Sequence, residues 1–299
     1  MMKHLVLSEQ DRQLLLHLHQ FIYLSKEFID DYIYNNPKDE PAVRVHERSV
    51  YRRLNKLEEA GYITSFSVPI KENSKRPSYI FTLTKFGLDV VEQMTGVVHW
   101  QTQWSHKPQI WYMHTLTMAE VVKSFEYNAP EGIMVKEFIP EARGHYEYFE
   151  KEKRHVIRPD GILIIGSPYS NENAGIMLEM ERSYASRPGT IRKLEQYNRF
   201  FDGYVKKGKA IENEVKFKKY EERMKKFDIG VGFEYPVDVQ KWSILFIGDN
   251  ESMGKRILNQ LRGLDCNVKL SSASKDDLKE NPYGEVYRTL LNPDKLSGL

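Results

Sequence analysis

The segment from residue 46 to residue 61 constrains the fold most, because it predicts a helix with two opposite faces. Val50, Leu54 and Leu57 recur at steps of four and three and form one apolar stripe. Gly61 follows the last turn, where glycine commonly ends a helix. At about 100° per residue, the remaining side points away from that stripe. The residues on that polar and basic side are Arg48, Ser49, Arg52 and Lys56.

Helix and strand patterns flank this segment on both sides. Ser8 and Ser25 are expected to cap two earlier helices, each followed by apolar residues at helical spacing. Residues 62–68 and 78–83 predict two strands joined by a basic turn, and a further helix follows. Three helices followed by a two-stranded ribbon is the winged helix-turn-helix plan. In that plan the third helix enters the major groove of DNA and the ribbon tip contacts the backbone or the minor groove.

Local charge supports a DNA-binding use of this zone. Between Arg44 and Lys56, five basic residues stand against one acid. Arginine pairs bidentately with guanine edges or phosphates, and lysine contacts phosphates. An alternative is a winged helix that contacts only proteins, with its basic side simply solvated. The residues expected to contact DNA are Arg44, Arg48, Ser49, Arg52, Arg53, Lys56, Lys75 and Arg76.

Global composition identifies no partner but excludes several classes of protein. The net charge is only +2, from 44 basic and 42 acidic residues. A single cysteine, Cys266, excludes an internal disulfide and a cysteine-rich metal site. No apolar run is long enough to span a bilayer, and the first residues lack the apolar core of a signal peptide. We therefore expect a cytoplasmic protein without a membrane partner.

The length of 299 residues suggests two domains. We assign residues 1–95 to the winged helix-turn-helix domain, 96–130 to a connector that leads into a helix, and 131–299 to a mixed α/β domain. Because one winged helix reads only a short site, a homodimer or higher oligomer is expected. The connector supplies apolar residues for that contact or for packing between the domains. These residues are Trp100, Trp104, Ile110, Trp111 and Tyr112.

The third zone alternates strands and helices, which makes the fold class α+β or α/β. Pro159 interrupts the second predicted strand and places it at a sheet edge or at a bulge. The run from Trp242 to Ile247 is nearly all apolar, as in a strand covered on both faces. The predicted strands are 133–139, 156–165, 175–181, 242–247 and 267–270, and the predicted helices are 190–201 and 252–261.

Acidic residues on two of these strands predict a candidate catalytic site. Asp160 lies in one strand, and Glu179 and Glu181, two residues apart, face the same side of the next. If the strands are neighbours, the three carboxylates converge, and Lys193 on the following helix reaches them. Carboxylate clusters suit Mg²⁺ or Mn²⁺, with Asp160 and Glu179 as the metal ligands. This is the site plan of PD-(D/E)XK nucleases, in which the lysine assists the attacking water.

The alternative is that these acids are structural. Glu179 and Glu181 are then ordinary strand residues with Arg182 and Lys193 as ion-pair partners, and Arg158 adds a further compensating charge. Three carboxylates without a cation repel one another, and basic neighbours relieve this repulsion without a metal.

Several segments, taken in order, carry a resemblance to a known family. They are residues 52–63, 79–87, 114–116, 158–160, 178–182, 193–197 and 244–247, the last before a helix containing Lys and Arg. With these segments the chain resembles the replication-relaxation proteins of plasmids and mobile elements in Gram-positive bacteria. The resemblance implies a DNA-binding winged helix joined to a restriction-endonuclease-like domain. It also implies a role in plasmid replication, DNA relaxation or the control of replication or transfer genes, with plasmid replication or relaxase machinery as partners.

Two departures from the family pattern bear on catalysis. Ser183-Tyr184-Ala185-Ser186 stands where the family usually has Gly-Thr-Glu, and Glu181 stands where the nuclease motif has lysine. We therefore expect a protein that binds double-stranded DNA at specific sequences. Its nuclease-like domain is expected to be degenerate and to need no cofactor. The first alternative is a Mg²⁺- or Mn²⁺-dependent nickase that uses Asp160, Glu179 and Lys193. The second is a protein-interaction adaptor.

Overall fold

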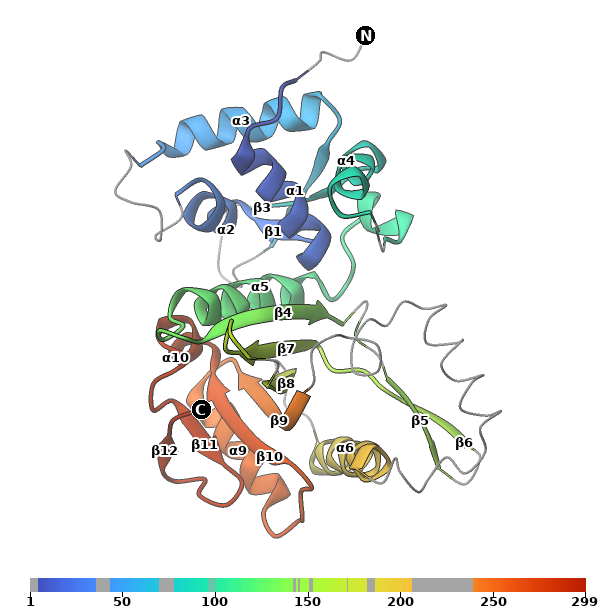
Figure 1. Cartoon of the computed structure of the whole chain (residues 1–299), viewed down its shortest axis with the longest axis vertical. Helices are drawn as coiled ribbons and strands as arrows, with labels where there is room; N and C mark the ends of the chain where they lie inside the picture. Colours follow the sequence, from blue (N-terminus) through green and yellow to red (C-terminus); the bar gives the residue numbers. More distant parts are fainter. Residues whose placement is uncertain are drawn as a thin grey trace. The chain divides into compact units, whose positions relative to one another are not determined.

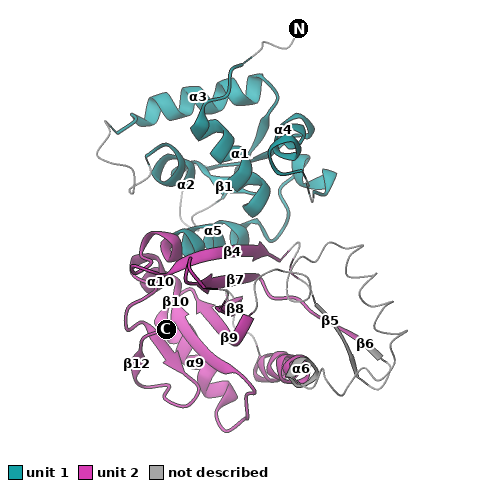
Figure 2. Cartoon of the chain, in the orientation of Figure 1, with its two compact units in different colours: residues 1–123 teal, residues 124–299 magenta. Residues whose placement is uncertain are grey.

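The computed structural model divides into two compact units, residues 1–123 and 124–299 (Figure 2). The boundary falls inside helix α5 (Tyr112–Tyr127), within the segment expected to be a connector. The predicted tip residues Lys75 and Arg76, and Arg182, lie outside the described residues. The structure describes residues 5–35, 44–69, 78–96, 98, 100–141, 144, 146–150, 153–170, 172–181, 186–205 and 239–299, without the side chains of 146–150, 153–154 and 202–205.

Unit 1 has helices around a small antiparallel sheet with strand order β1-β3-β2. Strands β2 and β3 pair from Ile63 opposite Leu83 to Val68 opposite Ser78, as the hairpin prediction required. The short strand β1 joins the other side of β3 and was not predicted. The elements are α1 (Glu9–Phe21), β1 (Leu24–Ser25), α2 (Lys26–Ile29), the π-helix η1 (Asp30–Tyr34), α3 (Glu47–Glu59), β2 (Ile63–Val68), β3 (Ser78–Leu83), α4 (Lys85–Thr95) and the 3₁₀-helix η2 (Thr102–Ser105).

The predicted helix ends of unit 1 are confirmed. Ser8 and Ser25 cap α1 and α2 with their side-chain oxygens. Gly61 has φ +80° and follows α3; its N–H donates to the Glu58 carbonyl at 2.9 Å, and the Tyr62 N–H donates to the Leu57 carbonyl at 2.9 Å. This pair of bonds is the Schellman motif, which satisfies carbonyls at the end of a helix. The end of α3 is therefore set by a residue that tolerates a positive φ.

Unit 2 is built on a seven-stranded mixed sheet in the order β12-β11-β10-β9-β8-β7-β4. Strands β8, β9 and β10 run parallel, and the other pairs are antiparallel. A separate hairpin pairs β5 with β6. The elements are β4 (Met134–Pro140), β5 (Tyr146–Glu150), β6 (Lys153–Ile157), β7 (Gly161–Gly166), β8 (Asn173–Glu181), α6 (Arg187–Val205), β9 (Val239–Gly248), α9 (Glu251–Leu261), β10 (Lys269–Ser274), α10 (Lys275–Glu280), β11 (Tyr287–Thr289) and β12 (Leu296–Ser297).

Helices α6 and α9 contact each other, and α9 packs on β9 and β10 (Figure 1). Apolar side chains from both helices and from the sheet strands form one buried cluster, which fixes α6 relative to β8. Its helical members are Leu194, Tyr197, Phe200, Phe201, Ile257, Leu258 and Leu261.

The structure corrects one predicted strand. Residues 156–165 do not form a single strand but end β6 at Ile157 and begin β7 at Gly161, and the two strands belong to different sheets. Pro159 stands between them, because it lacks the N–H that a ladder requires. Strand β7 is therefore internal, between β4 and β8, rather than at an edge. The mixed α and β architecture is as predicted, and no helix in the described ranges is long and apolar enough to cross a membrane.

Candidate functional sites

Helix α3 separates its two faces as predicted. Val50, Leu54 and Leu57 are fully buried. Arg48, Ser49, Arg52 and Lys56 are all exposed on the other side. Within the described part of the chain, no ion pair engages the three cationic side chains. The outward face of α3, defined by these four residues, is therefore a basic surface whose charge the surrounding fold leaves available.

Arg53, which the sequence predicts to contact DNA, is bonded to other residues of unit 1. Its Nε donates to Asp11 Oδ1 at 2.9 Å, and its guanidinium also donates to the Val6 carbonyl at 2.8 Å. Asp11 is fully buried on α1 and also accepts a hydrogen bond from the Tyr34 hydroxyl at 2.8 Å. Burial raises the pKa of Asp11, but the bonds from Arg53, Ser8 and Tyr34 outweigh it and lower that pKa. Arg53 thus joins α3 to α1 and is not part of the outward face.

The other charges near the start of α3 form surface pairs. Arg44 Nη2 lies 3.3 Å from Asp31 Oδ1, and both side chains are exposed. Glu47, the acid in the first turn of α3, pairs with Lys26. Because Lys26 engages this acid, Glu47 detracts little from the basic outward face.

The apolar connector packs largely within unit 1. Trp104 is buried and lies edge-on against Trp100 and Trp111. Its ring centroid is 5.1 Å from that of Trp100 and 6.2 Å from that of Trp111. The Tyr23 hydroxyl donates to the carbonyls of Trp104 and Lys107, each at 3.2 Å. Of the residues named for a dimer contact, Ile110 is 97% exposed. The tryptophans therefore have a structural role in this unit.

In unit 2, three carboxylates line up across three neighbouring strands. The Glu141 N–H donates to the Asp160 carbonyl at 3.2 Å, and the Asp160 N–H donates to the Leu178 carbonyl at 3.0 Å. Glu141 thus follows β4, Asp160 precedes β7, and Glu179 lies near the carboxyl end of β8. We call Glu141, Asp160 and Glu179 the carboxylate row. Glu141 was not predicted, although its position directly after a strand was a usable signal.

Glu179 is the buried centre of this region, with 1% of its surface exposed. Lys193 and the Tyr197 hydroxyl, both on α6, donate to its two carboxylate oxygens. Burial raises the pKa of Glu179 to about 7, although Lys193 opposes the shift. Burial alone would lower the pKa of Lys193, but Glu179 and Asp160 raise it overall. Lys193 therefore reaches Glu179 from the following helix, as the sequence suggested.

The remaining predicted residues lie around this pair. Glu181 is partly buried at the end of β8, and its charge helps to raise the pKa of Lys193. Burial, followed by the Asp160 charge, raises the pKa of Glu141, while Arg158 and Lys193 oppose that shift. The charges of Arg158 and Lys193 are therefore consistent with the alternative, structural interpretation of these acids.

The donor set does not fit a metal ion as it is arranged. Carboxylate oxygens suit Mg²⁺ or Mn²⁺, but both oxygens of Glu179 already accept hydrogen bonds. Asp160 Oδ2 accepts the Met180 N–H at 2.6 Å. Across the described residues, no three His, Cys, Asp or Glu side chains are grouped so that they could hold a metal. We derive no chemical step through a metal at this site.

Comparisons with known proteins identify the family. No curated protein matches the chain. The restriction endonuclease FokI shares 14% identity at a TM-score of 0.27, over 91% of this chain and 42% of that one. FokI bound to DNA shares 13% identity at a TM-score of 0.25, over 90% of this chain and 43% of the FokI chain. The chain thus spans less than half the length of these structures, and so weak a likeness adds nothing to the description of the fold. The replication-relaxation family profile matches residues 15–214, which is most of the sequence, and the chain belongs to that family.

Proposed function

We propose that the protein binds double-stranded DNA at specific sequences. It acts in the replication or relaxation of a plasmid or related mobile element. The outward face of α3 carries this proposal. Its apolar stripe is fully buried, while Arg48, Arg52 and Lys56 stay exposed on the opposite side. Exposed arginine and lysine side chains on one helix face suit base edges and phosphates.

The order of elements in unit 1 supports the same proposal. Helices α1, α2 and α3 precede the antiparallel pair β2-β3. This is the order of a winged helix-turn-helix domain, with α3 as the recognition helix. Membership of the replication-relaxation family is consistent with a DNA partner. We infer a homodimer on a two-fold symmetric site, because one recognition helix reads only a few base pairs.

For unit 2 we infer a degenerate restriction-endonuclease-like domain in which the acidic residues stabilise the fold. The carboxyl group of Glu179 is engaged by Lys193 and Tyr197, and Asp160 binds the backbone of β8. A buried acid with both oxygens hydrogen-bonded to neighbouring side chains stabilises one packing arrangement.

The test is footprinting on the DNA that flanks the chain's own gene. The wild type should protect a site with two-fold symmetry. The variant Arg48→Gln/Arg52→Gln/Lys56→Gln should lose that protection. The matched control is Lys241→Gln/Lys269→Gln/Lys295→Gln, which removes three exposed cations from unit 2 and should retain it. Equal protection by both variants would remove α3 from the proposal. The dimer is tested by light scattering of the protein–DNA complex, and a mass equal to the DNA plus one chain would contradict it.

A metal-dependent DNA nickase is the second candidate, favoured by the carboxylate row across β4, β7 and β8. Supercoiled plasmid that carries the native site, incubated with Mg²⁺ or Mn²⁺, separates the two candidates. We expect no efficient nicking. Open circles that form with the wild type and vanish with Asp160→Ala or Glu179→Ala would promote the nickase and assign the acids to catalysis.

A further inference from the structure

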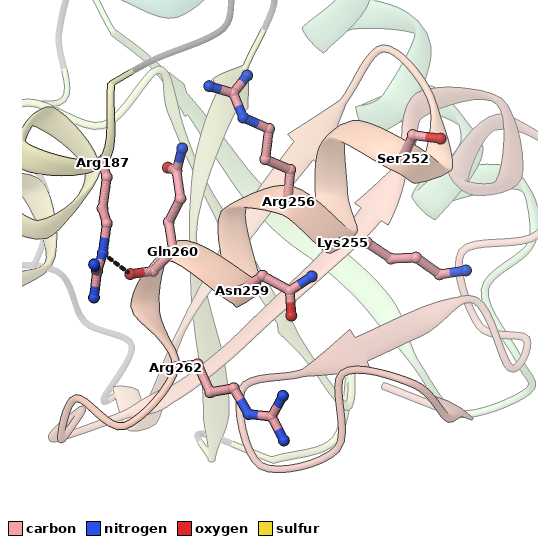
Figure 3. A pocket seen from close by; sticks show the side chains of 7 residues that line it. All are labelled: Arg187, Ser252, Lys255, Arg256, Asn259, Gln260 and Arg262. Atoms are coloured by element: carbon pink, nitrogen blue, oxygen red, sulfur yellow. Dashed lines mark hydrogen bonds between the residues drawn. The ribbon is translucent and has the colours of Figure 1, made fainter.

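A second basic surface lies in unit 2, on the side of α9 that faces away from the sheet. Met253, Ile257, Leu258 and Leu261 are buried against the core. The opposite side forms a surface hollow of about 710 Å³, bounded at one edge by Arg187 at the start of α6. Its lining contains four basic residues and no acid, and Figure 3 shows that their side chains point in different directions. We call this surface the α9 hollow; its basic residues are Arg187, Lys255, Arg256 and Arg262.

Hydrogen-bonding side chains stand between these cations. Ser252, Asn259 and Gln260 complete the lining. With Lys255 and Arg256 they fall at steps of three and four, which form one face of a helix. Phosphate contacts on DNA typically come from arginine and lysine together with serine, asparagine and glutamine. The hollow therefore offers both kinds of phosphate donor on one surface.

The contacts of Arg187 and Lys255 leave both cations open to a phosphate. Arg187 Nε donates to the Gln260 carbonyl at 3.3 Å, which holds the arginine at the rim without neutralising it (Figure 3). The nearby acid Glu251 pairs with Arg288 as well as with Lys255, the latter at 2.9 Å. Both members of the Lys255 pair are substantially exposed, and such pairs contribute only about 0–1 kcal/mol. A phosphate can therefore compete for Lys255.

We propose that the α9 hollow binds the sugar-phosphate backbone of duplex DNA, as a sequence-independent contact separate from the outward face of α3. This inference rests on the proposed DNA-binding function. The lining runs from Ser252 to Arg262, which spans about 15 Å along the helix. Such a spread suits a polyanion with many phosphates better than one small anion. The α9 residues lie beyond the stretch, 15–214, that the family profile matches.

The experiment measures anisotropy of a labelled random-sequence DNA duplex with the full chain at a series of salt concentrations. Lys255→Gln/Arg256→Gln/Arg262→Gln should bind about 10–100-fold more weakly, and its salt slope should flatten by about two to three units. The control Lys241→Gln/Lys269→Gln/Lys295→Gln should change the slope by less than about one unit. A thermal melt checks folding, and the double variant Lys255→Gln/Arg262→Gln replaces the triple if the triple is unstable.

The α3 triple variant separates this proposal from the proposed function. If the α3 variant loses DNA binding and the hollow variant matches its control, the hollow is overturned while α3 stands. If only the hollow variant loses binding to random-sequence DNA, the hollow stands. The recognition role of α3 falls if the α3 variant also keeps the footprint on the native site. If the hollow variant loses binding to an RNA hairpin but keeps duplex DNA, the assignment to DNA is overturned.

Discussion

The outward face of α3 and the carboxylate row of unit 2 both gather several charges, but they are built in opposite ways. On α3, Arg48, Arg52 and Lys56 are exposed, and no ion pair with another described residue engages them. In the row, Glu179 is buried and bonded to Lys193 and Tyr197. Exposed charge of one sign is satisfied by solvent or a partner, whereas buried charge must be satisfied from within. The contrast supports the proposal that α3 serves recognition and that the carboxylate row serves the stability of the fold.

The largest expected effect tests whether Arg53 belongs with the buried charges. Arg53→Ala leaves the fully buried Asp11 without its cation. Removing one partner of a buried pair costs about 3–5 kcal/mol, so the free energy of unfolding should fall by that order. The control Arg44→Ala breaks the exposed pair with Asp31 and should cost at most about 1 kcal/mol. Urea denaturation measures both. Equal losses would return Arg53 to the DNA-facing set.

The next effect concerns the pH dependence of Glu179. Burial raises its folded-state pKa to about 7, above that of the unfolded chain. The group therefore contributes stability at low pH that is lost as the pH rises through about 7. Relative to Glu179→Gln, the wild type should lose about 2–3 kcal/mol of unfolding free energy between pH 4.5 and pH 8. Unfolding curves at both pH values test this, and an unchanged difference would mean that Glu179 stays ionised throughout.

A smaller effect is expected from a single change on the outward face of α3. Arg52→Ala should cost about 1–3 kcal/mol of binding free energy on the cognate site if the side chain reads a base. Its stability should stay near that of the wild type, because Arg52 is exposed. Lys107→Ala, an exposed cation of unit 1 outside α3, is the control and should change neither quantity. Binding curves on cognate and random DNA separate base reading from phosphate contact.

The helices of unit 1 could be predicted because their signals are local. The stripe of Val50, Leu54 and Leu57 and the caps at Ser8, Ser25 and Gly61 all act within a few residues. The bond of Arg53 to Asp11 was not predicted, because the charge of Arg53 was considered and its position on the helix was not. It lies three residues after Val50 and four before Leu57, which places it at the edge of the buried stripe.

The sheet of unit 2 was harder to predict because its order depends on distant pairings. Strands β11 and β12 are short and were not predicted, and of the hairpin β5-β6 only residues 156–157 fell within a predicted strand. Glu141 joins Asp160 only through the pairing of β4 with β7. The Lys193 contact was foreseeable, because β8 leads directly into α6. The charge on α9 was visible in the sequence, but Arg187 joins this surface only because α6 packs beside α9.

The smallest expected effect separates the stability of α3 from its binding face. Gly61 has φ +80°, and a Cβ there would meet no atom within 4 Å, so only backbone strain opposes a substitution. Gly61→Ala should lower the free energy of unfolding by about 1–2 kcal/mol, the cost of a left-handed conformation with a side chain. Gly298→Ala, which has equal space and no positive φ, should change stability by less than about 0.5 kcal/mol. Below the melting temperature, DNA affinity of Gly61→Ala should match the wild type, because the exposed residues of α3 precede this end of the helix. Weaker DNA binding by the fully folded variant would show that the end of α3, and not only its outward face, contacts DNA.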